Sequence, residues 1–443
     1  MRRLVLLLAA LAVLATLWPA RSTGRPDLGR AQQGINDLSQ EVRSQFPEGI
    51  VFKLDFVSEE AVKEVRFRYA IAPDGARAYG VPDCVGVTAV QCTFDLESTV
   101  DNFLIPGVEI TYFWEIRDHA GNIIETEPGR CMYEDDRFQW ETLSEDGLTV
   151  WSYDASESDV RSLLSAGRET LERMGVLLGT KMDFPVKVFL YDSARDMEPV
   201  ILAGQLSPQG GVVTLGEVVV SDTAVVANDA FSLDILRHEL SHIVLRRAVR
   251  GPFRNLPAWI EEGVAVYGQS RPMADMESAL ESAIDRNQPL SVRSLSSASV
   301  GESEGSVSLF YGQSYSLVRF LIDEYGEEKL RALLAAFREG NRTDDALMQV
   351  YGFDQDGLEN AWRGSVGLPE RVIEEGQGQP PRPLPQITPF GAGESPPEQE
   401  VAPAAGDEED DGVAVVALMV VALATVAVAS AFAGAAVLLL RRR

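Results

Sequence analysis

Apolar and polar residues alternate along the chain between residues 50 and 140. The pattern is clearest in four segments, IVFKLDFVS, VKEVRFRYAIA, VQCTFDLES and EITYFWEIRD. A period of two residues places successive side chains on opposite faces of a strand, so each segment is predicted to be a β-strand. Turn-forming sequences lie between the segments, among them Pro73-Asp74-Gly75 and Pro106-Gly107.

Strands at this spacing are typical of a small all-β sandwich of the immunoglobulin or fibronectin type III kind, which we predict for residues 45–145. Cys84 and Cys92 are close enough in sequence to close a hairpin disulfide, and Cys131 is then left over. His119 lies in a predicted turn, where a single histidine is most often solvated.

The pattern changes after Trp151, where helical periodicity replaces alternation. Residues 156–178 are predicted to form an amphipathic helix, followed by a strand at 185–192 and one or two more within 210–222. Helical patterns then dominate, at 230–249, 256–268, 274–286, 311–325, 327–339, 342–350 and 355–364. A few strands followed by many helices predict an α+β domain over residues 150–368.

The two ends of the chain carry targeting patterns. Residues 1–21 combine two arginines with a short apolar run and are predicted to be a signal peptide. Residues 413–440 hold no charged side chain and are followed by three arginines, so we predict a single transmembrane helix. Residues 369–412, with nine prolines and an acidic run, are predicted to be a disordered linker. The expected location is the cell membrane, crossed once, with the N-terminal domains outside the cytoplasm.

The composition excludes one class of partner. The formal net charge is −28, and phosphate backbones are bound by clusters of lysine and arginine, so no nucleic-acid partner is expected. The acidity fits a solvated surface better than a cation-binding one.

One segment carries recognisable metal chemistry. LDILRHELSHIVLRR, residues 233–247, contains His238, Glu239 and His242 in an H-E-x-x-H arrangement. On a helix, residues four apart share a face, so both imidazoles can bind one Zn²⁺ ion while the glutamate reaches a water beside it. A chance match is the alternative, but the chain holds three histidines in all, and two of them lie here.

A catalytic zinc site needs a third protein ligand and an open position for water. No further histidine lies near the motif, so the third ligand is expected to be a carboxylate. The segment LPAWIEEGVAVYG, residues 256–268, offers Glu261 and Glu262, and this pattern does not decide between them.

The helix with H-E-x-x-H, followed about twenty residues later by W-x-x-E-G-x-A-x-Y, resembles the gluzincin metallopeptidases of the peptidase MA-like group. The resemblance covers roughly residues 150–367 and implies that Glu262 is the ligand. FYGQSYSLVRFLIDEYG, residues 310–326, resembles the helix that supplies an oxyanion-binding tyrosine, which would be Tyr311, with Tyr315 as second candidate. Both tyrosines fit core packing equally well. The G-x-M-E-N segment of aminopeptidase N is absent from the sequence, which argues against a typical aminopeptidase.

These patterns lead to two hypotheses of function. The first is a membrane-anchored extracytoplasmic zinc metallopeptidase for peptide or protein substrates, in which Glu239 takes a proton from the attacking water and Tyr311 stabilises the oxyanion. The alternative is a catalytically degenerate, zinc-containing binding or scaffold protein of the cell surface. The complete H-E-x-x-H and the spaced glutamate favour the peptidase.

Overall fold

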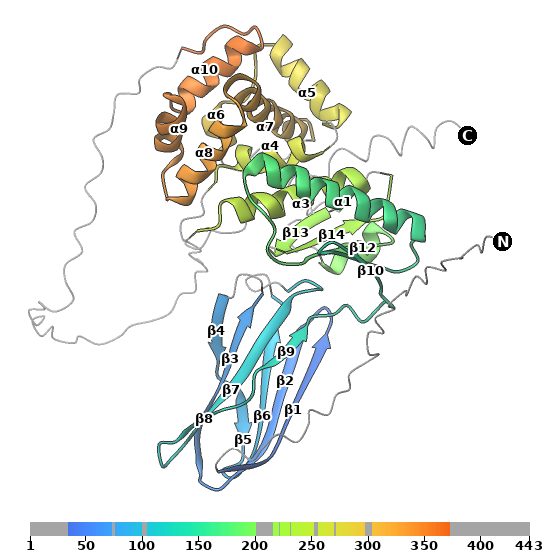
Figure 1. The fold of residues 1–443 in the computed structure, drawn as a ribbon, viewed down its shortest axis with the longest axis vertical. Coiled ribbons are helices and arrows are strands. Elements are labelled where there is room, and N and C mark those ends of the chain that lie inside the picture. The colour runs from blue at the N-terminus through green and yellow to red at the C-terminus, as the bar shows by residue number, and fades with distance from the viewer. Residues whose placement is uncertain are drawn as a thin grey trace, which may run out of the picture. The chain divides into compact units, whose positions relative to one another are not determined.

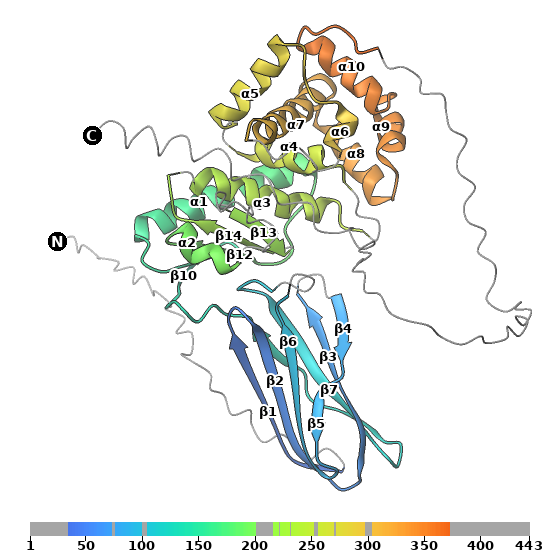
Figure 2. The same cartoon turned by 180° about the vertical axis from the view of Figure 1, so that it is seen from behind.

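A computed structural model describes residues 34–72, 76–99, 104–200, 216–220, 222–230, 232–251, 256–269, 272–296 and 304–372. The chain separates into two compact units, which divide between Trp140 and Glu141 (Figures 1 and 2). The expected signal peptide, residues 1–21, and the expected membrane helix, residues 413–440, lie outside the described residues, as does nearly all of the expected linker. No helix in the described ranges has the length and hydropathy needed to cross a bilayer.

The first unit consists of two antiparallel sheets, with strand orders β1-β2-β6-β5 and β4-β3-β7-β8, and with β9 paired to β7 (Figure 1). The strands are β1 (Ile35–Gln45), β2 (Gly49–Ser58), β3 (Val62–Ile71), β4 (Ala76–Gly80), β5 (Asp83–Val85), β6 (Ala89–Glu97), β7 (Glu109–Asp118), β8 (Ile123–Glu125) and β9 (Gly129–Met132). The four segments with alternating residues are β2, β3, β6 and β7. The immunoglobulin or fibronectin type of the unit stays a prediction.

Aromatic side chains join the two sheets of this unit. The ring of Phe67 on β3 lies 4.5 Å from that of Phe52 on β2 and 4.6 Å from that of Phe94 on β6, between ring centroids. Burying rings of this size supplies most of the stabilisation in a small sandwich. Cys84 and Cys92 form a disulfide between β5 and β6.

The second unit begins with a five-stranded sheet of order β10-β11-β12-β14-β13. The strands are β10 (Glu141–Glu145), β11 (Leu148–Ser152), β12 (Val186–Tyr191), β13 (Gly216–Val220) and β14 (Thr223–Ala227). The three inner strands are parallel and the two edge strands are antiparallel to them. The sequence pattern assigned residues 141–145 to the first domain, but β10 pairs with β11 in this sheet because the turn Asp146-Gly147 connects them.

Two long helices, α1 (Glu157–Leu178) and α3 (Ser232–Ala248), lie on one face of this sheet (Figure 1). Helix α1 starts where the Ser156 hydroxyl accepts a hydrogen bond from the backbone N–H of Asp159. It ends at Gly179, whose φ of 66° suits a residue without a side chain. A short helix, α2 (Ala194–Met197), and a 3₁₀ turn, η1 (Glu198–Val200), follow β12.

The remainder of the second unit is helical, with α4 packed against both α3 and α7 (Figure 2). These helices are α4 (Ala258–Gly268), α5 (Ala274–Asp285), α6 (Val292–Leu295), α7 (Glu304–Tyr325), α8 (Glu327–Arg338), α9 (Thr343–Tyr351) and α10 (Gln355–Ser365). The core includes the fully buried Trp259 and Trp362. The predicted order, β-sheets in the N-terminal part and then a mostly helical domain, is confirmed, and α7 begins seven residues before its predicted start.

Candidate metal centre and active site

Helix α3 places His238, Glu239 and His242 inside the second unit. His238 and Glu239 are buried, and His242 keeps 12% of its side-chain surface exposed. Leu236 and Leu240 from the same helix are fully buried in the core. The apolar stripe that anchors α3 therefore also fixes the direction of the two imidazoles.

Helix α4 places Glu262 beside His238 and His242. The close approach of α4 to α3 and α7 depends on two glycines. A Cβ atom added at Gly268 would lie 1.8 Å from the hydroxyl oxygen of Ser241 on α3. A Cβ atom added at Gly263 would lie 2.4 Å from the carbonyl oxygen of Ser314 on α7. Since Gly263 follows Glu262 directly, these contacts set how far the Glu262 carboxylate reaches.

Three ligand atoms converge at this point. The Nε2 atoms of His238 and His242 are 3.2 Å apart, and Glu262 Oε2 lies 3.4 Å from the first and 3.5 Å from the second. A tetrahedral zinc ion with bonds of about 2.0–2.1 Å requires ligand atoms about 3.3 Å apart. The set His238, His242 and Glu262 therefore has the donor chemistry and the spacing to hold a metal ion.

The two glutamates of the site have opposite pKa shifts. Burial raises the pKa of Glu239, and the charge of Glu262 adds to this, while the two histidines oppose it. Burial also acts to raise the pKa of Glu262, but the charge of His242 and hydrogen bonds from both histidines outweigh it and lower the pKa to about 2. Glu262 is thus held as a carboxylate, whereas Glu239 accepts a proton more readily than an ordinary glutamate does.

The pKa of His242 is shifted by its interaction with Glu262. Burial lowers its pKa, but the charge of Glu262 and the hydrogen bond to it reverse the effect, so that the pKa is raised overall. The imidazole and the carboxylate thus stabilise each other's charged forms.

Of the two candidate tyrosines, Tyr311 lies at the ligand cluster. Its ring centroid is 6.1 Å from that of His238. Burial raises its pKa well above 10.0, which keeps the phenol as a hydrogen-bond donor. Tyr315, one turn further along α7, packs against Tyr267 instead.

The alternative carboxylate, Glu261, does not join the ligand group. Within the described part of the chain, the group able to hold a metal consists of His238, His242 and Glu262. Glu261 and Glu262 are neighbours on α4, about 100° apart around the helix axis, so the helix can turn only one of them toward α3.

Sequence patterns did not identify a further contact, made by Gln269. This buried residue follows α4, and its Nε2 atom lies 3.3 Å from Nδ1 of His238. Its Oε1 atom is buried and has no hydrogen-bond partner among the described residues. No motif marks this glutamine, since a helix of any amphipathic pattern can be followed by one.

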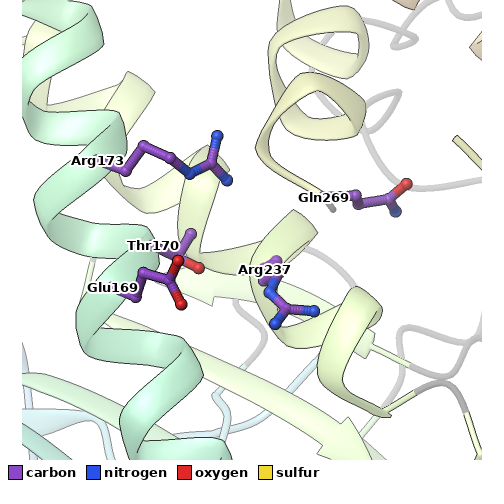
Figure 3. Close-up of a pocket in the computed structure, with 5 residues that line it drawn as sticks. All are labelled: Glu169, Thr170, Arg173, Arg237 and Gln269. Atoms are coloured by element: carbon purple, nitrogen blue, oxygen red, sulfur yellow. The ribbon is translucent and has the colours of Figure 1, made fainter. Parts of the chain in front are cut away.

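Gln269 also borders a polar cavity of about 350 Å³ (Figure 3). Arg237, on α3, lines the cavity directly before His238 in the sequence, and the opposite side is formed by α1 with Glu169, Thr170 and Arg173. None of the three ligands is among the described residues that line it. Gln269 thus connects this cavity to Nδ1 of His238.

Two solved structures match parts of this chain. A Br derivative of BhCBM56 is 12% identical and matches 22% of this chain and 98% of its own, with a TM-score of 0.17. The purple acid phosphatase PPD1 from seeds of yellow lupin (Lupinus luteus) is 9% identical and matches 36% of this chain and 29% of its own, with a TM-score of 0.19. Scores this low support no argument about fold or function, and a search of curated proteins finds no match.

A family model gives a more specific result. Residues 166–367 match the model of the Peptidase MA superfamily. The matched range contains the H-E-x-x-H helix, Glu262, Gln269 and Tyr311. The second unit therefore carries a peptidase MA-like, metallopeptidase-like domain.

Proposed function

We propose that this protein is a zinc-dependent peptidase that hydrolyses peptide bonds in peptides or proteins. The observation that carries the proposal is the convergence of His238 Nε2, His242 Nε2 and Glu262 Oε2, with spacings of 3.2–3.5 Å, beside the buried Glu239. The match to the Peptidase MA superfamily over residues 166–367 supports it independently.

His238, His242 and Glu262 would hold the metal. Zinc bound there would act as a Lewis acid that acidifies water and polarises a carbonyl group. The two imidazoles bind as neutral ligands, and the Glu262 carboxylate adds one negative charge. Three protein ligands leave room for water and substrate, unlike a structural site with four.

Glu239 is the general base of this proposal. It takes the proton from the attacking water and then passes it to the leaving amine. A carboxylate suits both steps, because it can take the proton in the first step and release it in the second. Its burial also keeps bulk water away from the transferred proton.

Tyr311 donates a hydrogen bond to the oxyanion that forms on the scissile carbonyl. Its ring centroid, 6.1 Å from that of His238, places the side chain at the ligand cluster. A hydrogen bond that is made to the developing oxyanion would favour the transition state over the ground state.

The experiment measures bound zinc and cleavage of a mixed peptide library by the parent protein and three variants. Glu262→Ala is expected to lose zinc, and Glu261→Ala, its neighbour on the same helix, is expected to keep it. Glu239→Gln is expected to keep zinc and to lose about 10²- to 10⁴-fold in turnover. Zinc without cleavage in the parent would favour the cell-surface binding protein, and a parent protein without zinc would refute both hypotheses.

The location of the protein is part of the same proposal and rests on sequence alone. The expected signal peptide, residues 1–21, and the expected membrane helix, residues 413–440, together hold both units outside the cytoplasm. Protease added to intact cells should then degrade both units, and protection of both units from the protease would contradict this location.

A further inference from the structure

The contact between Gln269 and His238 has a specific meaning for metal binding. As the side chains lie, the Gln269 amide nitrogen donates toward Nδ1 of His238, at 3.3 Å. That hydrogen bond requires an unprotonated Nδ1 and therefore places the ring proton on Nε2, the atom that faces His242 and Glu262. A proton on Nε2 prevents this atom from binding a metal.

Metal binding requires the other tautomer. When Nε2 binds a cation, Nδ1 carries the proton and must donate it to an acceptor. Gln269 offers one acceptor, its Oε1 atom, and this atom is buried without a partner among the described residues. Leaving a buried acceptor unpaired costs about 1–3 kcal/mol, so the structure contains an unsatisfied group that matches the requirement.

We propose that Gln269 is a positioning residue that selects the metal-binding tautomer of His238. Half a turn of its amide exchanges the oxygen and the nitrogen, so that Oε1 accepts the hydrogen bond from Nδ1–H. The imidazole is then held with the Nε2 lone pair directed toward His242 and Glu262. This inference rests on the proposed zinc site, which it extends to a residue that contacts no ligand atom.

The backbone around Gln269 is held well enough for this role. Gly268, directly before it, packs so closely on Ser241 of α3 that a larger residue would not fit. The carbonyl oxygen of Gly268 also accepts a hydrogen bond from the guanidinium of Arg173 on α1. The amide of Gln269 can therefore rotate while its Cα atom stays fixed relative to α3, which carries His238.

The test compares zinc affinity in the full-length protein, measured by competition with a chelating dye. Gln269→Leu and Gln269→Met remove the acceptor and keep the volume, and Gln269→Glu keeps an acceptor. Gln313→Leu is the matched control. Gln313 is also fully buried, but its amide oxygen accepts a hydrogen bond from the backbone N–H of Leu290 and its amide nitrogen donates one to the Leu290 carbonyl oxygen. It lies on α7, and its amide contacts Leu290 rather than His238.

A second readout reports the tautomer directly. The chain has three histidines, so ¹⁵N-labelled imidazoles give a spectrum simple enough to assign. In the zinc-loaded parent, Nδ1 of His238 should be protonated and should show the ¹⁵N chemical shift of a hydrogen-bonded N–H group. That shift should be lost in Gln269→Leu and kept in Gln313→Leu.

The expected result is a loss of about 10- to 100-fold in zinc affinity for both apolar variants, with affinity close to that of the parent for Gln269→Glu and Gln313→Leu. If the parent binds zinc and cleaves peptides while Gln269→Leu and Gln269→Met bind zinc equally well, the positioning role is wrong and the proposed function stands. An equal loss in Gln269→Glu or in Gln313→Leu would also overturn it. A parent without zinc would refute the proposed function, and this inference with it.

Discussion

The contact between α4 and α7 makes Gly263→Ala the most informative single substitution. The new Cβ atom would lie 2.4 Å from the Ser314 carbonyl oxygen and 2.7 Å from a methyl group of Val318. Ordinary van der Waals contact begins at 3.4 Å, so the two helices must separate by about 1 Å at this point. The carbonyl oxygen belongs to a helix backbone and cannot rotate away as a side chain would.

Two effects of opposite sign determine the change in stability. Overpacking a core costs about 1–3 kcal/mol. Alanine in place of glycine within a helix returns about 1 kcal/mol. The net expectation is a destabilisation of about 0–2 kcal/mol. Glu262 is the preceding residue, and its carboxylate should move with the helix, so zinc affinity should fall together with stability.

The matched control is Gly364→Ala in α10, where a Cβ atom would meet nothing within 4 Å. This variant should gain up to about 1 kcal/mol. Calorimetry should therefore separate the two variants by about 1–3 kcal/mol, at roughly 2–4 °C in Tm per kcal/mol for a domain of this size. Hydrogen exchange of peptides from α4 and α7 would locate the loss. If Gly263→Ala raised Tm as much as Gly364→Ala does, the argument from close approach would be wrong.

Three further predictions concern single side chains. Tyr311→Phe should lower kcat by about 10²- to 10³-fold and leave the zinc content unchanged. Tyr315→Phe, the control, should match the parent in steady-state assays. Equal activity of the two variants would exclude the oxyanion role of Tyr311. Burial raises the pKa of Cys131 from 9.0 to about 12, which lowers the fraction of reactive thiolate. Alkylation by iodoacetamide at about pH 8 should therefore be about a thousandfold slower in the folded protein than in urea. Equal rates would contradict this prediction. Burial acts to raise the pKa of Asp344, but hydrogen bonds, one of them from Arg293, lower it below 3.8. The stabilisation from this contact is therefore present above pH 3.8 and is lost as the pH falls through the lowered pKa. The difference in Tm between the parent and Arg293→Ala should shrink as the pH is lowered from about 6 to about 2. A constant difference would refute this prediction.

Local chemistry made the limits of some elements predictable from sequence. The helix predicted at residues 156–178 is α1, Glu157–Leu178, because a serine cap and a glycine mark its ends. The predicted limit at residue 145 places β10 in the first domain, and ETLSE has no apolar alternation that would mark it as a strand of the second. Its place is set by pairing with β11, and β1 was missed for a similar reason, since few of its residues are buried.

The candidate site also contains residues that the sequence pattern predicts and residues that depend on how the helices pack. The spacing of His238 and His242 was informative because residues four apart on one helix are neighbours whatever the rest of the fold does. The approach of Glu262 and Tyr311 depends on how α4 crosses α3 and α7, which is set by glycine contacts that no periodicity encodes. A resemblance to a known family supplied those two residues, and it did not supply Gln269.

The parallel pairing of β11 with β12 has a consequence for how this domain can be excised or exchanged between proteins. The family match begins at residue 166, inside α1, after both β10 and β11. A chain cut there would leave β12 as the sheet edge, although all six of its residues are buried in the intact unit. An exposed apolar edge of this kind invites pairing with other chains and insolubility. A fragment of the second unit that stays monomeric should therefore begin at or before Glu141, and recombination that preserves folding should cut between Trp140 and Glu141, well upstream of residue 166, where the family match begins.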